Sequence, residues 1–348
     1  MKGDRARLAR IGLGLSQQQL AQQVGVSRQA IAAIEAGITD PSLRVALALA
    51  RALSVAVEDL FSPTLDYPEV AVTSIAPQLA ASRADLAWVG GRPVALPLAG
   101  DHGISVGFSA AGGVIDTGGG RGLTVTPNRE TPPALVIAGC DPALALLPSI
   151  FAHLEPRMAC LWWPATNGEA LKLLRDGLVH VAGFHLADGI DYPSVDAKLF
   201  FFARWREGVA YRSTIPTPEL IEQGFRLANR QLGSEARHMV DQFLGDLGVT
   251  GEMVAGYDSS VSAHTLVGSA LASRVADFGV TIEPVALEFG LQFQPYASED
   301  FLLAIPEALV ATAEARTLFR ALTSQELRSQ LAAIRGYLQV ERSGEPIA

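Results

Sequence analysis

The chain has 348 residues, of which 49% are hydrophobic and 18% are charged, and its formal net charge is −9. This composition is typical of a globular protein of two or three domains and excludes a chain that is disordered along most of its length. The longest apolar runs are too short to span a membrane, and the charged start MKGDRARLARIG predicts no secretory signal. The two cysteines form neither a CxxC pair nor a disulfide framework, which fits a reducing cytoplasm. We therefore expect a cytoplasmic protein, and without an apolar span we expect no membrane partner.

The first part of the chain has helical periodicity throughout, which predicts a compact all-helical domain over residues 1–61. The apolar stripe expected to face its core consists of Leu43, Leu47, Ala50, Leu53, Val57 and Leu60. This segment holds seven Lys and Arg against five Asp and Glu, a charge of +2, which leaves −11 for the remainder. Only this domain is therefore suited to a polyanion.

Within this domain the stretch SQQQLAQQVGVSRQAIAAIEAG predicts two short helices joined by a tight turn. Ser16 and Gln19 form a capping box at the start of the first helix, and Gly25 ends it where a left-handed residue is needed. Ser27 caps the second helix, which we expect over residues 28–36.

The residue composition and pattern of the rest of the chain change twice. Residues 62–85 contain three prolines and have the composition of a linker with room for one helix. Residues 86–132 alternate short apolar runs, ISVGF among them, with glycine clusters, which predicts a β-rich spacer. Over residues 133–340 apolar strands alternate with amphipathic helices, which predicts parallel sheets with helices on both faces. The expected fold class is multidomain: an all-α domain followed by an α/β domain.

The small Ala21, the turn at Gly25 and the inward Ile31 resemble the helix-turn-helix of the phage-repressor-like (Xre) family of transcriptional regulators. The resemblance covers about residues 5–61 and implies that the second helix lies in the major groove of double-stranded operator DNA. It places these residues at the DNA surface: Gln17, Gln18, Arg28, Gln29 and Ala33. The alternative is a helical hairpin that only packs a core.

The chemistry of DNA recognition then depends on Arg28 and Gln29. Gln29 can pair with adenine and Arg28 with guanine or a phosphate, whereas Ala33 offers only an apolar contact to a thymine methyl. Arg10 and Glu35 match an ion pair of the family, which implies a structural role. Because a charge of +2 binds DNA weakly at cellular salt, we expect a homodimer on a two-fold operator with half-sites about 34 Å apart.

Several helix starts in the α/β half follow small polar residues, and such starts hold anions without net positive charge. A resemblance to the type II periplasmic-binding-protein-like domain is carried by GCDPALALL, TNGEALKLLRDGLVHVAGFHLAD, LANRQLGSEAR, SAHTLVGSALASRVADFGV, FGLQFQP and DFLLAIP. That domain is fused to Xre-type regulators and occurs in molybdopterin biosynthesis proteins. The resemblance, over about residues 134–310, implies a two-lobed clamp, linked by two crossovers, that closes on a small anionic effector. It implies molybdate, tungstate or a molybdenum-cofactor species as that effector, and no other cofactor.

The helix starts and the resemblance together suggest these ligand-binding residues: Cys140, Asp141, Thr166, Asn167, Gly168, His185, Tyr192, Ser234, Arg237, Ser262 and His264. Arg237 either clamps an anion or pairs with Asp241 on its own helix, and we favour the clamp. The GSGTR motif of the family reads Gly-Ser-Glu-Ala-Arg at 233–237, so a carboxylate stands beside the expected anion. Trp162 and Trp163 are expected between the core and the cleft wall.

Catalysis and metal binding have no sequence signature here. A GxSxG elbow, a Walker A motif and an HExxH motif are absent, and the histidines and cysteines lack ligand spacing, so we expect neither an enzyme nor a metal site. His185 and His264 also have a purely structural alternative. The sequence therefore predicts a ligand-responsive transcriptional regulator. Two alternatives stay open: a regulator that senses another metabolite, and one whose C-terminal domain serves mainly for protein assembly.

Overall fold

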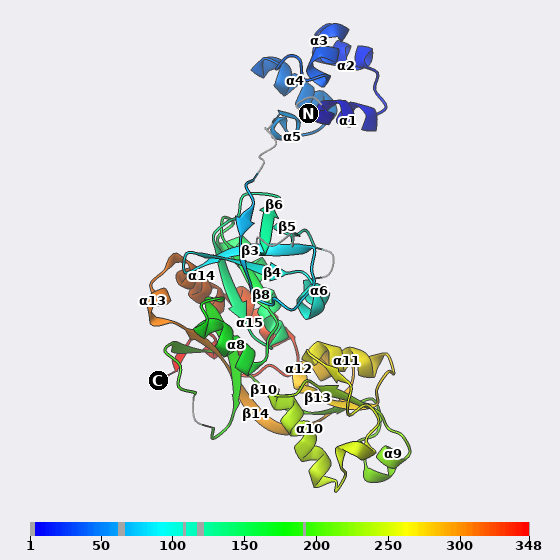
Figure 1. Ribbon diagram of the computed structural model, residues 1–348, viewed down its shortest axis with the longest axis vertical. Helices are drawn as coiled ribbons and strands as arrows, with labels where there is room; N and C mark the ends of the chain where they lie inside the picture. The colour runs from blue at the N-terminus through cyan, green and yellow to red at the C-terminus, as the bar shows by residue number, and fades with distance from the viewer. Residues whose placement is uncertain (1–3, 62–66, 107–108, 117–121, 191–192, 348) are drawn as a thin grey trace. The chain divides into compact units, whose positions relative to one another are not determined.

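The computed structural model describes residues 4–61, 67–106, 109–116, 122–190 and 193–347. The chain divides into two units, Met1–Tyr67 and Pro68–Ala348 (Figure 1). None of the helices in the described residues is long and apolar enough to cross a membrane.

The first unit is all-helical, as its periodicity predicts. Its helices are α1 (Asp4–Gly12), α2 (Gln17–Val24), α3 (Arg28–Glu35), α4 (Leu43–Leu53) and α5 (Val57–Phe61). The core contains Leu20, Ile31, Leu49 and Leu60, each at most 2% exposed. Because each helix contributes a narrow apolar stripe to one cluster, burial of that cluster holds these short helices together.

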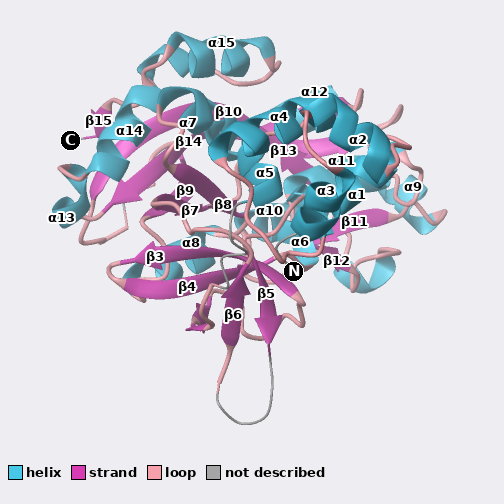
Figure 2. Ribbon diagram, turned by 90° about the horizontal axis from the view of Figure 1, so that it is seen from above, coloured by secondary structure: helices cyan, strands magenta, loops and turns pink. Residues whose placement is uncertain are grey.

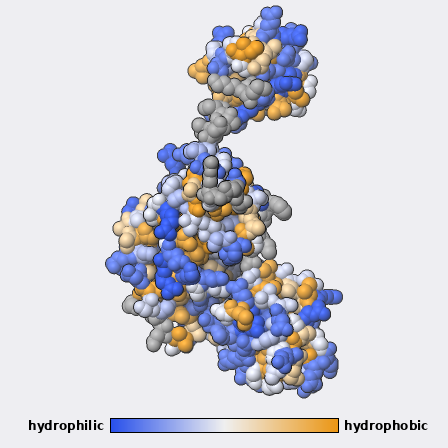
Figure 3. Space-filling view, in the orientation of Figure 1, coloured by the Kyte–Doolittle hydropathy of each residue, from blue (hydrophilic) through white to orange (hydrophobic). Residues whose placement is uncertain are grey.

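The stripe predicted for α4 is wrong at its start, because Leu43 is 73% and Leu47 is 43% exposed. Helix α4 instead buries Ala46, Leu49, Ala50 and Leu53. Both sets have helical spacing, and packing of α4 against α2 and α5 selects the second one. Figure 3 shows apolar side chains among hydrophilic ones on the surface of this unit.

The second unit begins with a small sheet in the order β1-β6-β5-β3-β4-β2. Its elements are β1 (Val70–Ala71), β2 (Thr73–Ser74), β3 (Arg83–Val89), β4 (Arg92–Pro97), α6 (Gly100–Val106), β5 (Gly113–Asp116) and β6 (Thr124–Pro127). The helix expected within 62–85 is replaced, in the described part, by strands. The run ISVGF, expected as a strand, begins inside α6, since five residues are too few to separate a period of two from a helix.

A larger mixed sheet follows, in the order β12-β11-β13-β10-β14-β9-β7-β8, with β15 paired to β10. Its strands are β7 (Ala134–Ala138), β8 (Ala159–Trp163), β9 (Val181–Ala187), β10 (Lys198–Tyr211), β11 (Leu227–Arg230), β12 (Ser260–Val261), β13 (Phe278–Ile282), β14 (Gln292–Ile305) and β15 (Pro346–Ile347). Parallel pairing holds at both ends of this order, but β10 and β14 pair antiparallel along their whole length. The expected parallel pairing therefore holds at both ends of the sheet and is wrong at its centre.

Helices cover both faces of this sheet (Figure 2). They are η1 (Pro142–Leu146), α7 (Leu147–Leu154), α8 (Asn167–Arg175), α9 (Pro218–Glu222), α10 (Glu235–Asp246), η2 (Gly251–Met253), α11 (His264–Ala272), α12 (Glu283–Glu288), α13 (Glu307–Val310), α14 (Ala313–Leu322), α15 (Gln325–Ala333) and η3 (Val340–Arg342). One core joins β7, β9 and η1 to α7, α14 and α15, and another joins the same strands to α8 and to the small sheet. The small sheet is thus packed on the first lobe.

Strands β10 and β14 connect the two lobes. Pairing of β14 with β9 places one end of each long strand in the first lobe, and pairing of β10 with β13 places the other end in the second. The ladder between them shifts register beside Gly208, where a Cβ atom would lie 2.1 Å from the carbonyl oxygen of Gln294. A glycine is therefore required where the strands cross between the lobes.

Candidate functional site

The DNA-binding candidates lie on two helices whose ends are set by local hydrogen bonds. The Oγ of Ser16 accepts from the backbone N–H of Gln19, and the Gln19 side chain accepts from the N–H of Ser16, which completes the predicted capping box. Gly25 ends α2 with a φ of +75°. The Oγ of Ser27 accepts from the N–H of Ala30 and caps α3. These bonds orient the first turn of α3 without help from distant segments.

An ion pair ties α1 to α3, as the resemblance implies. Arg10 donates to Glu35 through Nε at 2.6 Å and through a terminal nitrogen at 3.0 Å, and it also donates to the carbonyl of Leu15 at 2.6 Å. Burial opposes ionisation of Glu35, but the hydrogen bonds from Arg10 and Gln17 outweigh it and lower its pKa. The pair is therefore charged at neutral pH and structural.

The expected DNA contacts differ in how accessible they are. Gln18, Arg28 and Gln29 are exposed, and Ala33 is half-buried. Gln17 is half-buried as well, and its side-chain nitrogen donates to Glu35 at 3.0 Å, so this residue is partly committed to the ion pair. The exposed pair at the start of α3 keeps its polar groups available for a ligand in front of the helix.

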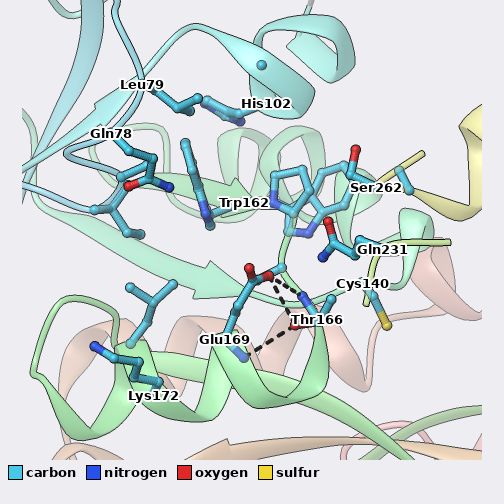
Figure 4. A pocket seen from close by; sticks show the side chains of 18 of the residues that line it. Gln78, Leu79, His102, Cys140, Trp162, Thr166, Glu169, Lys172, Gln231 and Ser262 are labelled. Carbon is cyan, nitrogen blue, oxygen red and sulfur yellow. Dashed lines mark hydrogen bonds between the residues drawn. The ribbon is translucent and has the colours of Figure 1, made fainter. Parts of the chain in front are cut away.

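A cavity of about 590 Å³ opens between the two lobes and the small sheet. Its walls come from the first lobe through Trp162 and α8, from the second lobe through Gln231 and residues 262–265, and from the small-sheet region through residues 75–79 and His102. Figure 4 shows Thr166, Glu169 and Lys172 along α8, with Gln78, Leu79 and His102 across the cavity. The cleft is thus closed on one side by segments that the sequence suggested were linker and spacer.

The ligand residues expected from the sequence fall into three groups. Those that line the cavity are Cys140, Thr166, Ser262 and His264, together with both tryptophans at 162 and 163. Those that lie off its walls are Asp141, Asn167, Gly168, His185, Ser234 and Arg237. Tyr192 lies outside the described residues.

Internal hydrogen bonds explain why most of the second group lies off the walls. Asp141 is fully buried and accepts from Ala143, Trp205 and Tyr337, so its oxygens are used within the protein. Asn167 donates to and accepts from the backbone of His185 at 2.9 and 3.1 Å, which ties α8 to β9. The hydrogen bonds of these side chains fix the elements that surround the cavity.

Arg237 pairs with Asp241 on its own helix, the less favoured of the two roles expected from the sequence. Its Nε lies 3.4 Å from Oδ1 of Asp241, and its guanidinium lies 4.2 Å from the centroid of the Tyr257 ring. The favoured clamp is not what this geometry provides, because the charge is already paired and stacked. Ser234 caps α10 by accepting from the N–H of Arg237 at 3.2 Å.

Sequence patterns missed several of the residues that line the cavity. His102 is 3% exposed, neither of its ring nitrogens has a partner among the described residues, and its ring lies 5.0 Å from that of Trp163. Burial lowers its pKa to about 4, so it is neutral at pH 7. Gln78, Lys172 and Gln231 add polar groups. No periodicity or motif connects residues 75–102 with the cleft, so only the packing of the small sheet reveals them.

Polar groups in this cavity favour recognition by hydrogen bonds. Helix α8 starts at the wall with Thr166, whose N–H and hydroxyl both donate to Glu169 at 3.0 Å. Helix α11 has Ala263 as its N-cap residue, without a side-chain cap among the described residues, and Ala263, His264 and Thr265 line the cavity. Uncapped helix starts are suited to an anion.

Behind the cavity wall lies a buried group of ionisable side chains. His185 contacts Glu299 through Nδ1. Burial alone would lower the pKa of His185, but Cys140 and Glu299 outweigh burial and raise this pKa well above its usual value. Burial raises the pKa of Glu207 to about 8, with the charge of Glu299 adding to the effect. Burial lowers the pKa of His264 well below its usual value, so this ring is neutral at pH 7.

Family models match a segment of each of the two units of the chain. A model described as PBP superfamily domain matches residues 149–323, and a helix-turn-helix model matches residues 7–60. The uncharacterized protein YvgK of Bacillus subtilis is 29% identical over 123 residues, 34% of this chain but only 38% of that protein. An uncharacterized HTH-type transcriptional regulator of Methanocaldococcus jannaschii is 51% identical over 47 residues, 14% of this chain and 71% of that protein. An ABC-type phosphate transport receptor from Vibrio cholerae has a TM-score of 0.41 at 12% identity, over 59% of this chain and 99% of that one.

Proposed function

We propose that an effector held between the lobes controls the binding of the protein to operator DNA. The premise is that the chain belongs to the PBP superfamily domain family and is a helix-turn-helix transcriptional regulator. The observation that carries the proposal is the cavity, whose walls come from both lobes and from the small-sheet region and include polar and aromatic side chains. A ligand that touches both lobes stabilises one arrangement of them over another, and only such a difference in affinity changes DNA binding.

The DNA-binding half of the proposal depends on the exposed Arg28 and Gln29 at the start of α3. Bidentate hydrogen bonds from these side chains discriminate guanine and adenine in the major groove. The charge of +2 over residues 1–61 is small, so we propose a homodimer whose two copies of α3 contact two half-sites.

For the effector we propose a small anion, with a molybdenum-cofactor species favoured over bare molybdate or tungstate. A cavity of about 590 Å³ is in the range that holds organic ligands of moderate size, and it exceeds what one tetrahedral oxyanion fills. Trp162, Trp163 and His102 offer ring surfaces for a planar heterocycle. The start of α11 and the hydroxyls of Ser262 and Thr265 offer donors for the anionic part.

Two alternatives predict different titrations. An uncharged metabolite would use the same ring surfaces without needing the start of α11. A C-terminal unit that serves only for assembly would bind none of these ligands, although the chain would still bind DNA.

Calorimetric titration of the full chain with molybdopterin, molybdate, tungstate and phosphate tests the proposal, with native mass spectrometry of the purified protein to identify any ligand that accompanies it. We expect one bound molybdopterin per chain and weaker binding of the bare oxyanions. The variant Ser262→Ala should weaken binding, whereas Ser149→Ala on the exposed surface of α7 should not. Absence of binding by all four anions would contradict the anion proposal and favour the alternatives.

A further inference from the structure

Three side chains from neighbouring strands meet on one face of the larger sheet. His185 of β9 lies opposite Phe301 of β14, two residues from Glu299 on that strand. Glu299 in turn lies opposite Trp205 of β10, two residues from Glu207. Because residues two apart along a strand share a face, His185, Glu299 and Glu207 are on the same side of the sheet.

These three side chains lie close enough to share one ion. One donor atom from each lies within 4.8 Å of the others, and donors bound to one tetrahedral ion are roughly 3.4 Å apart for metal bonds of about 2.1 Å. The three residues are 5%, 0% and 4% exposed, in the order His185, Glu207 and Glu299. Small rotations of the side chains are therefore sufficient to bring them around an ion.

Glu207 has no hydrogen-bond partner for either carboxylate oxygen among the described residues, although it is fully buried. Nδ1 of His264 lies 3.9 Å from its Oε1, beyond hydrogen-bond distance. Arg230 acts on Glu207 through its charge, so an internal ion network is the competing explanation. A buried carboxylate without hydrogen bonds is unfavourable unless it is protonated or another cation completes its surroundings.

We propose that His185, Glu207 and Glu299 bind one divalent transition-metal ion, such as Zn²⁺, in a site behind the wall of the proposed effector cavity. One imidazole nitrogen with carboxylate oxygens is a donor set suited to zinc, iron or nickel rather than to calcium or magnesium. The two carboxylates match the charge of the ion. His264, on the second lobe, is the neighbouring donor that would link the ion to α11.

The surroundings hold the proposed ligands in place. The ring of Trp205 lies 5.0 Å from that of His185, and its indole N–H donates to Asp141 at 3.0 Å. Asn167 binds both backbone polar groups of His185. Such supporting contacts orient metal ligands before the ion arrives.

Titration of the full chain with ZnCl₂, after removal of metals with a chelator, tests the site by calorimetry and by the visible absorption of bound Co²⁺. We expect one ion per chain, and at least tenfold weaker binding in Glu207→Gln and in Glu299→Gln. The control His153→Gln removes an exposed imidazole that contacts Glu326, and its affinity should equal that of the wild type.

A melting experiment separates a metal site from an ion network. If Glu207 is a metal ligand, metal-free Glu207→Gln should melt no lower than the metal-free wild type, and it should lose the rise in Tm that Zn²⁺ causes in the wild type. A lowered Tm without metal, together with no effect of Zn²⁺ on the wild type, would establish the ion network and overturn the proposal. Binding of Mg²⁺ as tight as that of Zn²⁺, or Zn²⁺ binding unchanged in both Gln variants, would overturn it too.

Discussion

The expected DNA contacts of the first unit all lie within residues 17–33, whereas the cavity of the second unit draws its walls from segments between residues 75 and 265. In the first unit the cap at Ser27 orients α3 through a bond to a residue three positions away. In the second, His102 and Trp163 meet only because the small sheet packs on the first lobe. A site built from local bonds is open to prediction from sequence, and a site built from packing is not. The following experiments probe this difference.

The largest effect is expected from removing both side chains at the start of α3. Arg28→Ala with Gln29→Ala should cost about 1–3 kcal/mol for each lost base contact in each half-site of the operator. Fluorescence anisotropy with operator and unrelated DNA measures the specific and the non-specific affinity. The control Arg51→Ala removes an equal charge from the exposed last turn of α4 and should leave the ratio of the two affinities unchanged. An unchanged ratio in the double variant would contradict the assignment of α3.

The ion pair of the first unit comes next in size. Arg10→Met leaves Glu35 charged and 6% exposed without its main partner, which should lower the free energy of unfolding by about 3–5 kcal/mol. Hydrogen exchange of the amides in α1 to α4 measures this loss. The double variant Arg10→Met with Glu35→Leu should recover most of it, because no buried charge remains. Equal losses in both variants would show that packing, and not the charge, sets the stability.

The pH dependence of the second unit should reveal His102. Its pKa is about 4 in the folded protein and about 6.5 when unfolded, so the unfolded chain binds more protons between these values. Stability should therefore fall as the pH drops from 6.5 to 4, by roughly 3 kcal/mol at ~1.36 kcal/mol per pKa unit.

Tryptophan fluorescence follows this unfolding, since Trp88, Trp162, Trp163 and Trp205 all lie in the second unit. His102→Phe keeps an aromatic ring beside Trp163 and should reduce the slope, while the lowered pKa of His264 retains part of it. The control His153→Gln, at an exposed position, should retain the slope of the wild type. A slope in His102→Phe equal to that of the wild type would assign the acid sensitivity to other groups.

The smallest effect concerns the aromatic wall of the cavity. Trp162→Leu should weaken binding of molybdopterin by about 0.5–1.5 kcal/mol, the range of a ring contact, and should leave binding of bare molybdate nearly unchanged. The control Trp88→Leu changes a tryptophan that is 49% exposed and does not line this cavity. Calorimetry that finds equal losses for both ligands would argue against stacking.

Within the second unit, the sequence predicted several helix caps but not which of them line the cavity. Thr166 was predicted from its capping pattern, and it lines the cavity at the start of α8. Asp141 has a similar pattern, but Trp205 and Tyr337 reach it from distant strands and loops and use its oxygens. No spacing in the sequence carries that information. The same reason explains why Arg237 stacks on Tyr257 and does not face the cavity.

The sequence by itself determined the caps, the turn at Gly25 and the ion pair of Arg10 with Glu35, because bonds between near neighbours or a closely matched motif specify them. Tertiary structure decided which face of α4 is buried and that β10 runs antiparallel to β14. It also decided which polar side chains face the cavity and which meet behind it. The polar groups at helix ends are hydrogen-bonded within one turn of the chain. Strand register and burial depend on contacts between residues about a hundred positions apart, which sequence periodicity does not specify.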